Sequence, residues 1–125
     1  MNLLAWALQI LLALAFLAAG TLKATRPKEQ LREQMAWVDH FSAPQVKGIG
    51  AVEILGALGL VLPAATSTAV VLTPLAAVGL ALVMAGAVIT HARIKEPVSA
   101  WIPAIVLGVL AVVVAVLRFG PAPLS

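Results

Sequence analysis

Four long apolar segments constrain the fold of this chain more than any other feature of its sequence. Each is close to the roughly 20 residues that an α-helix needs to cross the hydrocarbon core of a bilayer, and none has the short alternating pattern of a barrel strand. We place the spans at about residues 3–22, 46–65, 68–91 and 99–119. The sequence therefore predicts an all-α fold, a polytopic membrane four-helix bundle, in a single domain over residues 1–125.

The composition agrees with this fold class and excludes several functions. Apolar residues make up 62% of the chain and charged residues 10%, which lies outside the usual range for a soluble globular domain. The chain has no cysteine, which excludes disulfides, thiolate zinc sites, iron–sulfur clusters and cysteine nucleophiles. Its basic residues lie beside the spans and are interleaved with acids, so we attribute them to topology and lipid contact rather than to nucleic acid.

The first span raises the question of a cleaved signal peptide. The stretch "FLAAG" contains small residues of the type found at cleavage sites. However, no Lys or Arg precedes the apolar run, and the run is longer than the core of a typical signal peptide. We therefore expect a retained helix.

A polar segment, "KATRPKEQLREQMAWVDHFSAPQVK", separates the first two spans. After Pro27, the residues Leu31, Met35 and Val38 fall on one face at helical spacing, with charged residues elsewhere. We predict a short amphipathic interfacial helix that lies along the membrane surface, with Trp37 near the interface and "SAP" ending it. The alternative is a solvated connector.

Lysine and arginine are unevenly distributed among the loops. Loops one and three, which share a side in a four-span topology, hold seven of them, at positions 23, 26, 28, 32, 47, 93 and 95. The other side holds only Arg118 and the amino terminus. The positive-inside rule therefore places loops one and three in the cytoplasm and both termini outside.

Glu53 lies in the otherwise apolar stretch "GAVEILGALGLVLP". An ionised carboxylate in hydrocarbon costs roughly 2.5–3.5 kcal/mol even on lenient insertion scales, so it should face the bundle interior and have a partner. Lys23 ends span one and His91 ends span three, and the topology brings both toward the membrane face near which Glu53 lies. We expect Glu53 to pair with Lys23 or His91, and the spacing also allows a Lys–Glu–His group.

One stripe of span one supports this arrangement. Gln9, Ala13, Phe16, Gly20 and Lys23 recur at helical spacing along the whole span. If the stripe faces the interior, Lys23 points toward the carboxylate of span two and Gly20 lets that span approach closely. Gln9 is then a second polar group near the outer side.

Two interpretations of the polar group remain open. In the first, Glu53 belongs to a buried ion pair that fixes helix register, and Lys23 and His91 are interfacial residues that snorkel toward water. In the second, Glu53 lines a pocket that opens toward the cytoplasmic leaflet, where it hydrogen-bonds a ligand or exchanges protons with His91. Position along the chain does not separate the two.

No recognisable catalytic or cofactor motif is present in the sequence. It lacks the H-E-x-x-H, P-loop, G-x-G-x-x-G and G-x-S-x-G patterns. Its two histidines, His40 and His91, do not form an in-membrane pair of haem ligands, and a metal held by Glu53 and His91 would be short of ligands. We expect no metal site and favour a chain that is not an enzyme on its own.

Three stretches together resemble the signatures of the DoxX-like family of small four-helix membrane proteins: "FLAAGTLKATRP", "GAVEILGALGLVLP" and "LALVMAGAVITHARI". They occur in order and cover nearly the whole chain. The resemblance implies a bundle in the bacterial cytoplasmic (inner) membrane, a loose link to respiratory or thiosulfate–quinone redox systems, and an assembly chaperone for receptor channels among animal relatives. The positions most like the family's motif residues are Gly20, Lys23, Glu53, Gly56 and His91.

The sequence is compatible with three functions of different classes. The bundle could bind a small lipophilic ligand, for which a quinone is one candidate, through a site that comprises Glu53, Lys23, His91, Gln9, Gly20 and Gly56. It could instead be a non-enzymatic accessory or assembly protein that packs against a larger membrane partner or a second copy through its glycine-rich faces. The third option is an enzyme in which Glu53 and His91 exchange protons during quinone chemistry. A roomy cavity beside Glu53 favours the first function, and a tightly packed interior favours the second.

Overall fold

The computed structural model describes residues 1–124, and within that range every regular element is helical. The long helices are α1 (Asn2–Thr25), α3 (Ala43–Thr66), α4 (Leu72–Arg93) and α5 (Ile102–Phe119). The short elements are α2 (Lys28–Leu31) and two 3₁₀ turns, η1 (Ala36–His40) and η2 (Val98–Ala100). All four long helices are long and apolar enough to cross a membrane, which confirms the predicted fold class.

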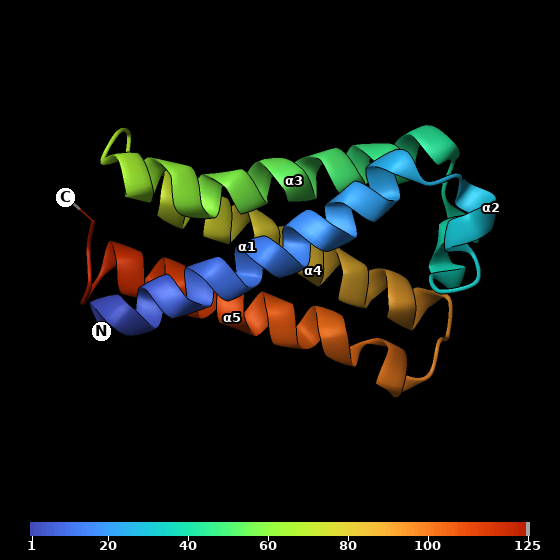
Figure 1. Cartoon of the computed structure of the whole chain (residues 1–125). Helices are drawn as coiled ribbons and strands as arrows, with labels where there is room; N and C mark the ends of the chain where they lie inside the picture. The colour runs from blue at the N-terminus through green and yellow to red at the C-terminus, as the bar shows by residue number, and fades with distance from the viewer. Residues whose placement is uncertain (125) are drawn as a thin grey trace.

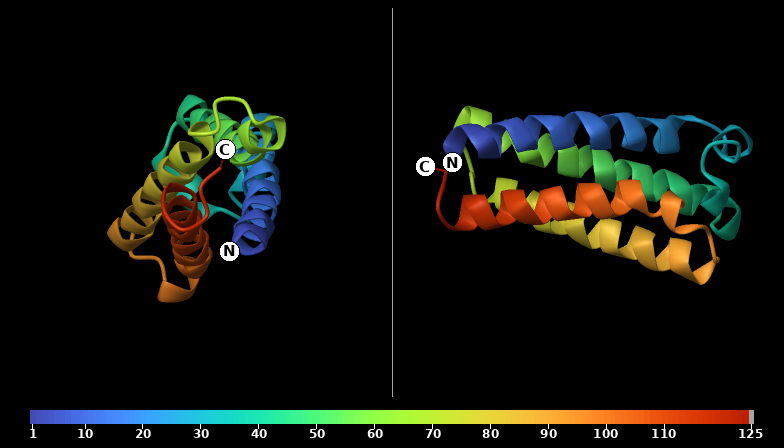
Figure 2. Two further views of the ribbon diagram at one scale, coloured as in Figure 1. Left: turned by 90° about the vertical axis from the view of Figure 1, so that its left-hand side faces the viewer. Right: turned by 90° about the horizontal axis from the view of Figure 1, so that it is seen from below.

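The four long helices form one bundle in which each runs antiparallel to the next along the chain (Figure 1). Both termini and the α3–α4 turn lie at one end, which we call the terminal end; α2, η1 and the α4–α5 connection lie at the other, the loop end. The most extensive contacts join α1 to α3 and α4 to α5. Between these two pairs, α1 and α5 separate toward the loop end (Figure 1), and Figure 2 shows the bundle along and across its axis.

The bundle has an apolar interior and an apolar exterior. Its core residues come from all four helices and include Leu12, Phe16, Leu60, Leu80 and Val114, each with no more than 1% of its surface exposed. Large apolar residues are also exposed on the outside of every long helix, such as Leu3, Leu55, Leu82 and Val116. An apolar exterior is what a bundle surrounded by lipid requires, because its backbone polar groups are already paired within the helices.

The helix starts differ from the expected spans where local capping decides them. α3 begins at Ala43 rather than near Val46, because Ser42 and Gln45 form a capping box. The backbone N–H of Gln45 donates to Ser42 Oγ at 3.2 Å, and the backbone N–H of Ser42 donates to Gln45 Oε1 at 2.9 Å. The "SAP" stretch therefore begins α3, and it follows the preceding helical turn, which ends at His40.

The starts of α4 and α5, in contrast to that of α3, lie later than predicted. Residues 67–71 form turns, and Ser67 and Ala69 have left-handed φ angles of 52° and 49°, so α4 begins at Leu72 rather than at residue 68. The turn η2 occupies residues 98–100, so α5 begins at Ile102 rather than at residue 99. Neither boundary changes the number of helices or their order.

The segment between α1 and α3 is helical only in two short pieces. The expected amphipathic helix is interrupted after Leu31 and resumes as the 3₁₀ turn η1. Its apolar face exists as predicted, since Leu31 and Val38 are buried, but they pack together with Val46 of α3 and Leu22 of α1. The buried residues of this face are therefore covered by the ends of α1 and α3, so the segment caps the loop end.

α1 and α3 approach each other closely at two glycines near that cap. A Cβ atom on Gly50 would lie 2.6 Å from the carbonyl oxygen of Gly20, and a Cβ atom on Gly20 would lie 2.7 Å from the carbonyl oxygen of Gly50. Both distances are too short for real contacts, so only glycine fits at either position. A Cβ atom on Gly20 would also meet Glu53, and one on Gly50 would meet Lys23, so the close approach lies beside these two residues.

We predict that Gly50→Ala destabilises the protein by about 1–3 kcal/mol, because the added methyl group must push α1 away from α3. Gly48→Ala is the matched control: it lies on the same helix, and a Cβ atom there would meet nothing within 4 Å. Unfolding in detergent, followed by circular dichroism, measures both. An equal loss of stability in the two variants would contradict the proposed contact.

Candidate functional site

The carboxylate within α3 pairs with Lys23, one of the two partners that the sequence predicts. Lys23 Nζ lies 2.5 Å from Glu53 Oε1 and donates a hydrogen bond to it. Lys23 follows Gly20 in α1 by one helical turn, and Glu53 follows Gly50 in α3 in the same way, so the close approach of the two helices brings these side chains together. Glu53 is 1% exposed and Lys23 8%, so this ion pair is buried.

Each member of the ion pair keeps hydrogen-bonding capacity that the surrounding protein does not use. An ammonium group has three donors, and within residues 1–124 Lys23 Nζ donates only to Glu53 Oε1. Glu53 Oε2 has no hydrogen-bond partner in the same range. Lys23 Nζ also lies 5.7 Å from the centre of the Trp37 ring, which is within reach of a cation–π interaction.

A cavity of about 460 Å³ lies beside this ion pair. Its lining comes from all four long helices and from η1 and η2, which places it at the loop end, where α1 and α5 separate. The lining is mostly apolar, and its charged or hydrogen-bonding members other than Trp37 are Lys23, Glu53, Thr90 and His91. The apolar lining residues are Ala19, Phe41, Ile49, Val83, Met84, Gly86, Ala87, Ala100, Pro103, Ala104 and Leu107.

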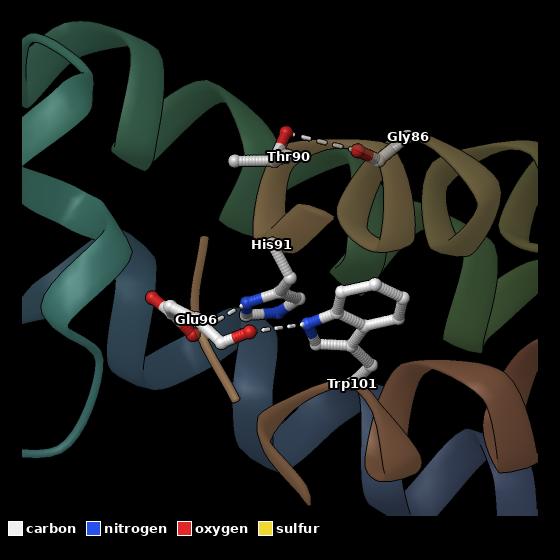
Figure 3. Close-up of polar contacts among 5 residues, drawn as sticks. All are labelled: Gly86, Thr90, His91, Glu96 and Trp101. Carbon is white, nitrogen blue, oxygen red and sulfur yellow. Dashed lines mark hydrogen bonds and ion pairs between the residues drawn. The ribbon is translucent and has the colours of Figure 1, made fainter. Parts of the chain in front are cut away.

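His91 reaches the cavity with a partner of its own (Figure 3). Its Nδ1 atom lies 2.7 Å from Glu96 Oε2, in the connection between α4 and α5. Trp101 Nε1 donates to the backbone carbonyl oxygen of Glu96 at 3.1 Å, which ties that connection to the start of α5. Thr90, one residue before His91, donates its hydroxyl proton to the carbonyl oxygen of Gly86 at 2.9 Å and so leaves its own oxygen able to accept.

The structure therefore brings together three of the residues singled out in the sequence. Lys23, Glu53 and His91 line one cavity, but the carboxylate that pairs with His91 is Glu96 and not Glu53. The two predicted glycines have packing contacts instead: Gly20 faces α3, and a Cβ atom on Gly56 would meet the side chain of Leu80. Neither glycine is among the residues that line the cavity.

Gln9 lies near the terminal end and belongs to a different polar cluster. Its Nε2 atom donates to the carbonyl oxygen of Leu60 at 2.6 Å, and its Oε1 atom accepts from Arg118 Nε at 2.6 Å. Arg118 Nη1 also donates to Asn2 Oδ1 at 2.8 Å and to the carbonyl oxygen of Ala122 at 2.9 Å. This cluster joins α5 to α1 and α3, and Arg118 is only 3% exposed.

Sequence reasoning missed several residues of both clusters. Glu96 lies in a loop, where helical periodicity does not indicate which way a side chain points. Its position five residues after His91 is nevertheless a signal for a local pair. Trp37 and Phe41 line the cavity from the η1 segment, because that segment folds over the end of the bundle. From the sequence, Arg118 contributes only to the count of charges on each side of the membrane. Its position within the last turn of an apolar span is the feature that indicates burial.

The chemistry available in the cavity is hydrogen bonding and proton exchange in an apolar setting. Lys23 can donate, Glu53 and Thr90 can accept, and His91 can do either. Among residues 1–124, no three His, Asp or Glu side chains lie close enough together to hold a metal ion.

Comparison with known proteins identifies the family. A family model described as the DoxX-like family matches residues 7–114. The chain belongs to the DoxX-like family, and its four apolar helices make it a multi-pass membrane protein. No curated protein and no solved structure gives a significant match.

We predict that Lys23→Met lowers the free energy of unfolding by about 3–5 kcal/mol, because it leaves the buried Glu53 carboxylate without its counter-charge. The double variant Lys23→Met/Glu53→Leu should recover most of that loss, since it removes both charges. The control is Arg32→Met, which breaks the exposed Arg32–Asp39 pair and should cost no more than about 1 kcal/mol. Equal small losses in both single variants, measured by unfolding in detergent, would contradict a buried pair.

Proposed function

We propose that this multi-pass membrane protein of the DoxX-like family binds a small lipophilic ligand, of which a quinone is one candidate, in the cavity beside the Lys23–Glu53 ion pair. The observation that carries the proposal is the cavity itself. It is about 460 Å³ in volume and brings apolar side chains from four helices together with a few convergent polar groups. Ligand sites of proteins typically have volumes of about 300–1,000 Å³ and this kind of lining.

The polar groups suit a ligand that is apolar over most of its surface and carries hydrogen-bonding oxygens at one end. Lys23 can donate to a carbonyl oxygen without giving up Glu53, since two of its three donors are unused within residues 1–124. Val83, Met84 and Leu107 supply an apolar surface for a tail. Quinones combine these two features, and a quinone ligand would agree with a role in membrane redox processes.

A second candidate is an accessory or assembly role beside a larger membrane protein or a second copy of the chain. The observation that favours it is a shallow apolar groove between α4 and α5, which includes the small residues Ala85, Ala104 and Gly108. Small residues allow close helix packing in membranes. The two roles are compatible, because the groove and the main cavity share only Met84 and Ala104 of their linings.

We also propose that the protein resides in the bacterial cytoplasmic membrane with its loop end in the cytoplasm. Seven of its eight lysine and arginine residues belong to the segments around α2 and the α4–α5 connection. The positive-inside rule places such segments on the cytoplasmic side. In this orientation the cavity lies in the cytoplasmic half of the bundle and both termini lie outside.

We expect wild-type protein, purified in mild detergent, to retain a defined lipophilic compound that mass spectrometry identifies after solvent extraction. Ala19→Leu should reduce that compound severalfold, because Ala19 lines the cavity and leucine would fill part of it. Ala18→Leu is the matched control, since Ala18 is exposed on the outer face of the same helix. Glu53→Gln should also reduce the compound, because it weakens the polar end of the site.

The outcome that would contradict ligand binding is bulk phospholipid alone, in equal amounts, in the wild type and all three variants. That result would favour the accessory role, and the groove between α4 and α5 would then be the surface on which to seek a partner.

The orientation can be tested directly, because the chain has no cysteine and single cysteines give no background labelling. In spheroplasts, a membrane-impermeant maleimide should label Thr68→Cys in the α3–α4 turn. It should label Ser99→Cys in η2 only after the membrane is permeabilised. The reverse pattern would show that the loop end faces outward.

A further inference from the structure

The contact between His91 and Glu96 fixes how the histidine ring can bind a ligand. A carboxylate only accepts hydrogen bonds, so the 2.7 Å contact between Nδ1 and Glu96 Oε2 requires a proton on Nδ1. In a neutral imidazole the other ring nitrogen, Nε2, then carries the lone pair. In the neutral form of His91, Glu96 therefore makes Nε2 the hydrogen-bond acceptor, whereas a protonated ring would donate from both nitrogens.

The surrounding backbone holds Glu96 in this position (Figure 3). The N–H group of Glu96 donates to the carbonyl oxygen of His91 at 3.1 Å, and the carbonyl oxygen of Glu96 accepts from Trp101 Nε1 at 3.1 Å. The preceding residue, Lys95, has a left-handed φ angle of 60°, which turns the chain back toward α4. The carboxylate is thus fixed by three elements: the end of α4, the turn and the start of α5.

The acceptor atom of His91 is free for a ligand. Within residues 1–124, Nε2 forms no hydrogen bond. In that range, the buried side-chain atoms that lack a hydrogen-bond partner are Glu96 Oε1 and Arg118 Nη2. His91 Nε2 is not among them, so it is unpaired but not sealed from solvent. Because the His91 ring lines the cavity, the unpaired acceptor belongs to a group that a cavity ligand can reach.

Two further features narrow the chemistry of the ligand. Lys23 presents a donor to the same cavity, so the ligand also needs an acceptor oxygen. Trp37 and Phe41, whose rings are 5.6 Å apart and nearly perpendicular, both line the cavity at the loop end. Aromatic side chains in such arrangements pack favourably against another planar ring.

We propose that the ligand is a hydroxylated aromatic ring with an apolar tail, which donates its hydroxyl proton in a hydrogen bond to His91 Nε2. This inference rests on the proposed function, because it assigns the chemical class of the ligand in the same cavity. Of the two redox forms of a quinone, only the quinol carries the hydroxyl group that this hydrogen bond requires. The hydroxyl oxygen remains able to accept from a donor such as Lys23.

Two probes that differ only at the hydroxyl group test this hydrogen bond without redox chemistry. 4-Nonylphenol can donate, and its methyl ether, 4-nonylanisole, cannot. Both have the same ring and tail. For the wild-type protein in detergent, we expect 4-nonylphenol to bind roughly tenfold more tightly, because the bound ether would cover the His91 acceptor without pairing it. Microscale thermophoresis on labelled protein measures both dissociation constants.

The variant Glu96→Gln tests whether Glu96 sets this preference. A glutamine amide can donate to Nδ1 through its nitrogen as well as accept from Nδ1 through its oxygen, so Nε2 is no longer fixed as the acceptor. We expect the preference for 4-nonylphenol to fall to about twofold or less while the affinity for 4-nonylanisole is retained. Glu33→Gln, which removes an exposed acid from the loop between α1 and α3, should keep the tenfold preference.

The outcomes distinguish a failure of the proposed ligand class from a failure of the proposed function, ligand binding in the cavity. Equal affinities for both probes in the wild type would overturn the inference and leave the ligand site intact. If neither probe binds to the wild type and neither raises its thermal unfolding temperature, the proposed function itself fails for aromatic ligands of this kind. A tenfold preference that persists in Glu96→Gln would show that the carboxylate of Glu96 is not required to set the acceptor.

A second measurement does not depend on whether Glu96→Gln folds. In wild-type protein labelled with ¹⁵N-histidine, nitrogen chemical shifts report which ring atom of His91 carries the proton, with His40→Gln used to assign the signals. We expect a protonated Nδ1 and an unprotonated Nε2, and a change at Nε2 when 4-nonylphenol is added. A protonated Nε2 in the free protein would overturn the inference.

Discussion

The buried ion pair between Lys23 and Glu53 is the interaction on which the rest of this structure depends. A lone carboxylate at the depth of Glu53 would cost several kcal/mol, so α3 can span the membrane there only with a partner. Lys23 supplies it at 2.5 Å, and Gly20 and Gly50 allow the two helices to come close enough for the contact. The pair thus fixes α1 against α3 and places two charged groups at the inner wall of a cavity.

The two ends of the bundle are held together in different ways. At the terminal end, Arg118 hydrogen-bonds Gln9 and Asn2 and so attaches α5 to α1. Its hydrogen-bond partners among residues 1–124 are neutral amides and carbonyl groups. At the loop end, the cavity lies between these helices and is covered by η1 and η2. The bundle is therefore closed by polar contacts at one end and hollow at the other, which agrees with a ligand site in one half of the membrane.

The sequence predicts the helices well, because apolar length and periodicity are properties of single segments. It also limits the partner of Glu53 to Lys23 or His91, since a buried carboxylate restricts the choice to the few ionisable residues at the same depth. It does not predict the partner of His91, because Glu96 lies in a turn whose direction depends on the left-handed Lys95. The position of Trp37 and Phe41 at the cavity is not predicted for a related reason: it depends on how their segment folds against the ends of α1 and α3.

The central claim is that the space beside Lys23 and Glu53 holds a ligand and is not a packing gap filled by neighbouring side chains. The most direct test is an experimental structure of the protein purified from its native membrane, at a resolution that shows ordered small molecules. The account predicts elongated non-protein density in the cavity, with its polar end within hydrogen-bond distance of Lys23 Nζ. A cavity closed by α5 packed against α1, with Glu53 still paired to Lys23, would contradict it.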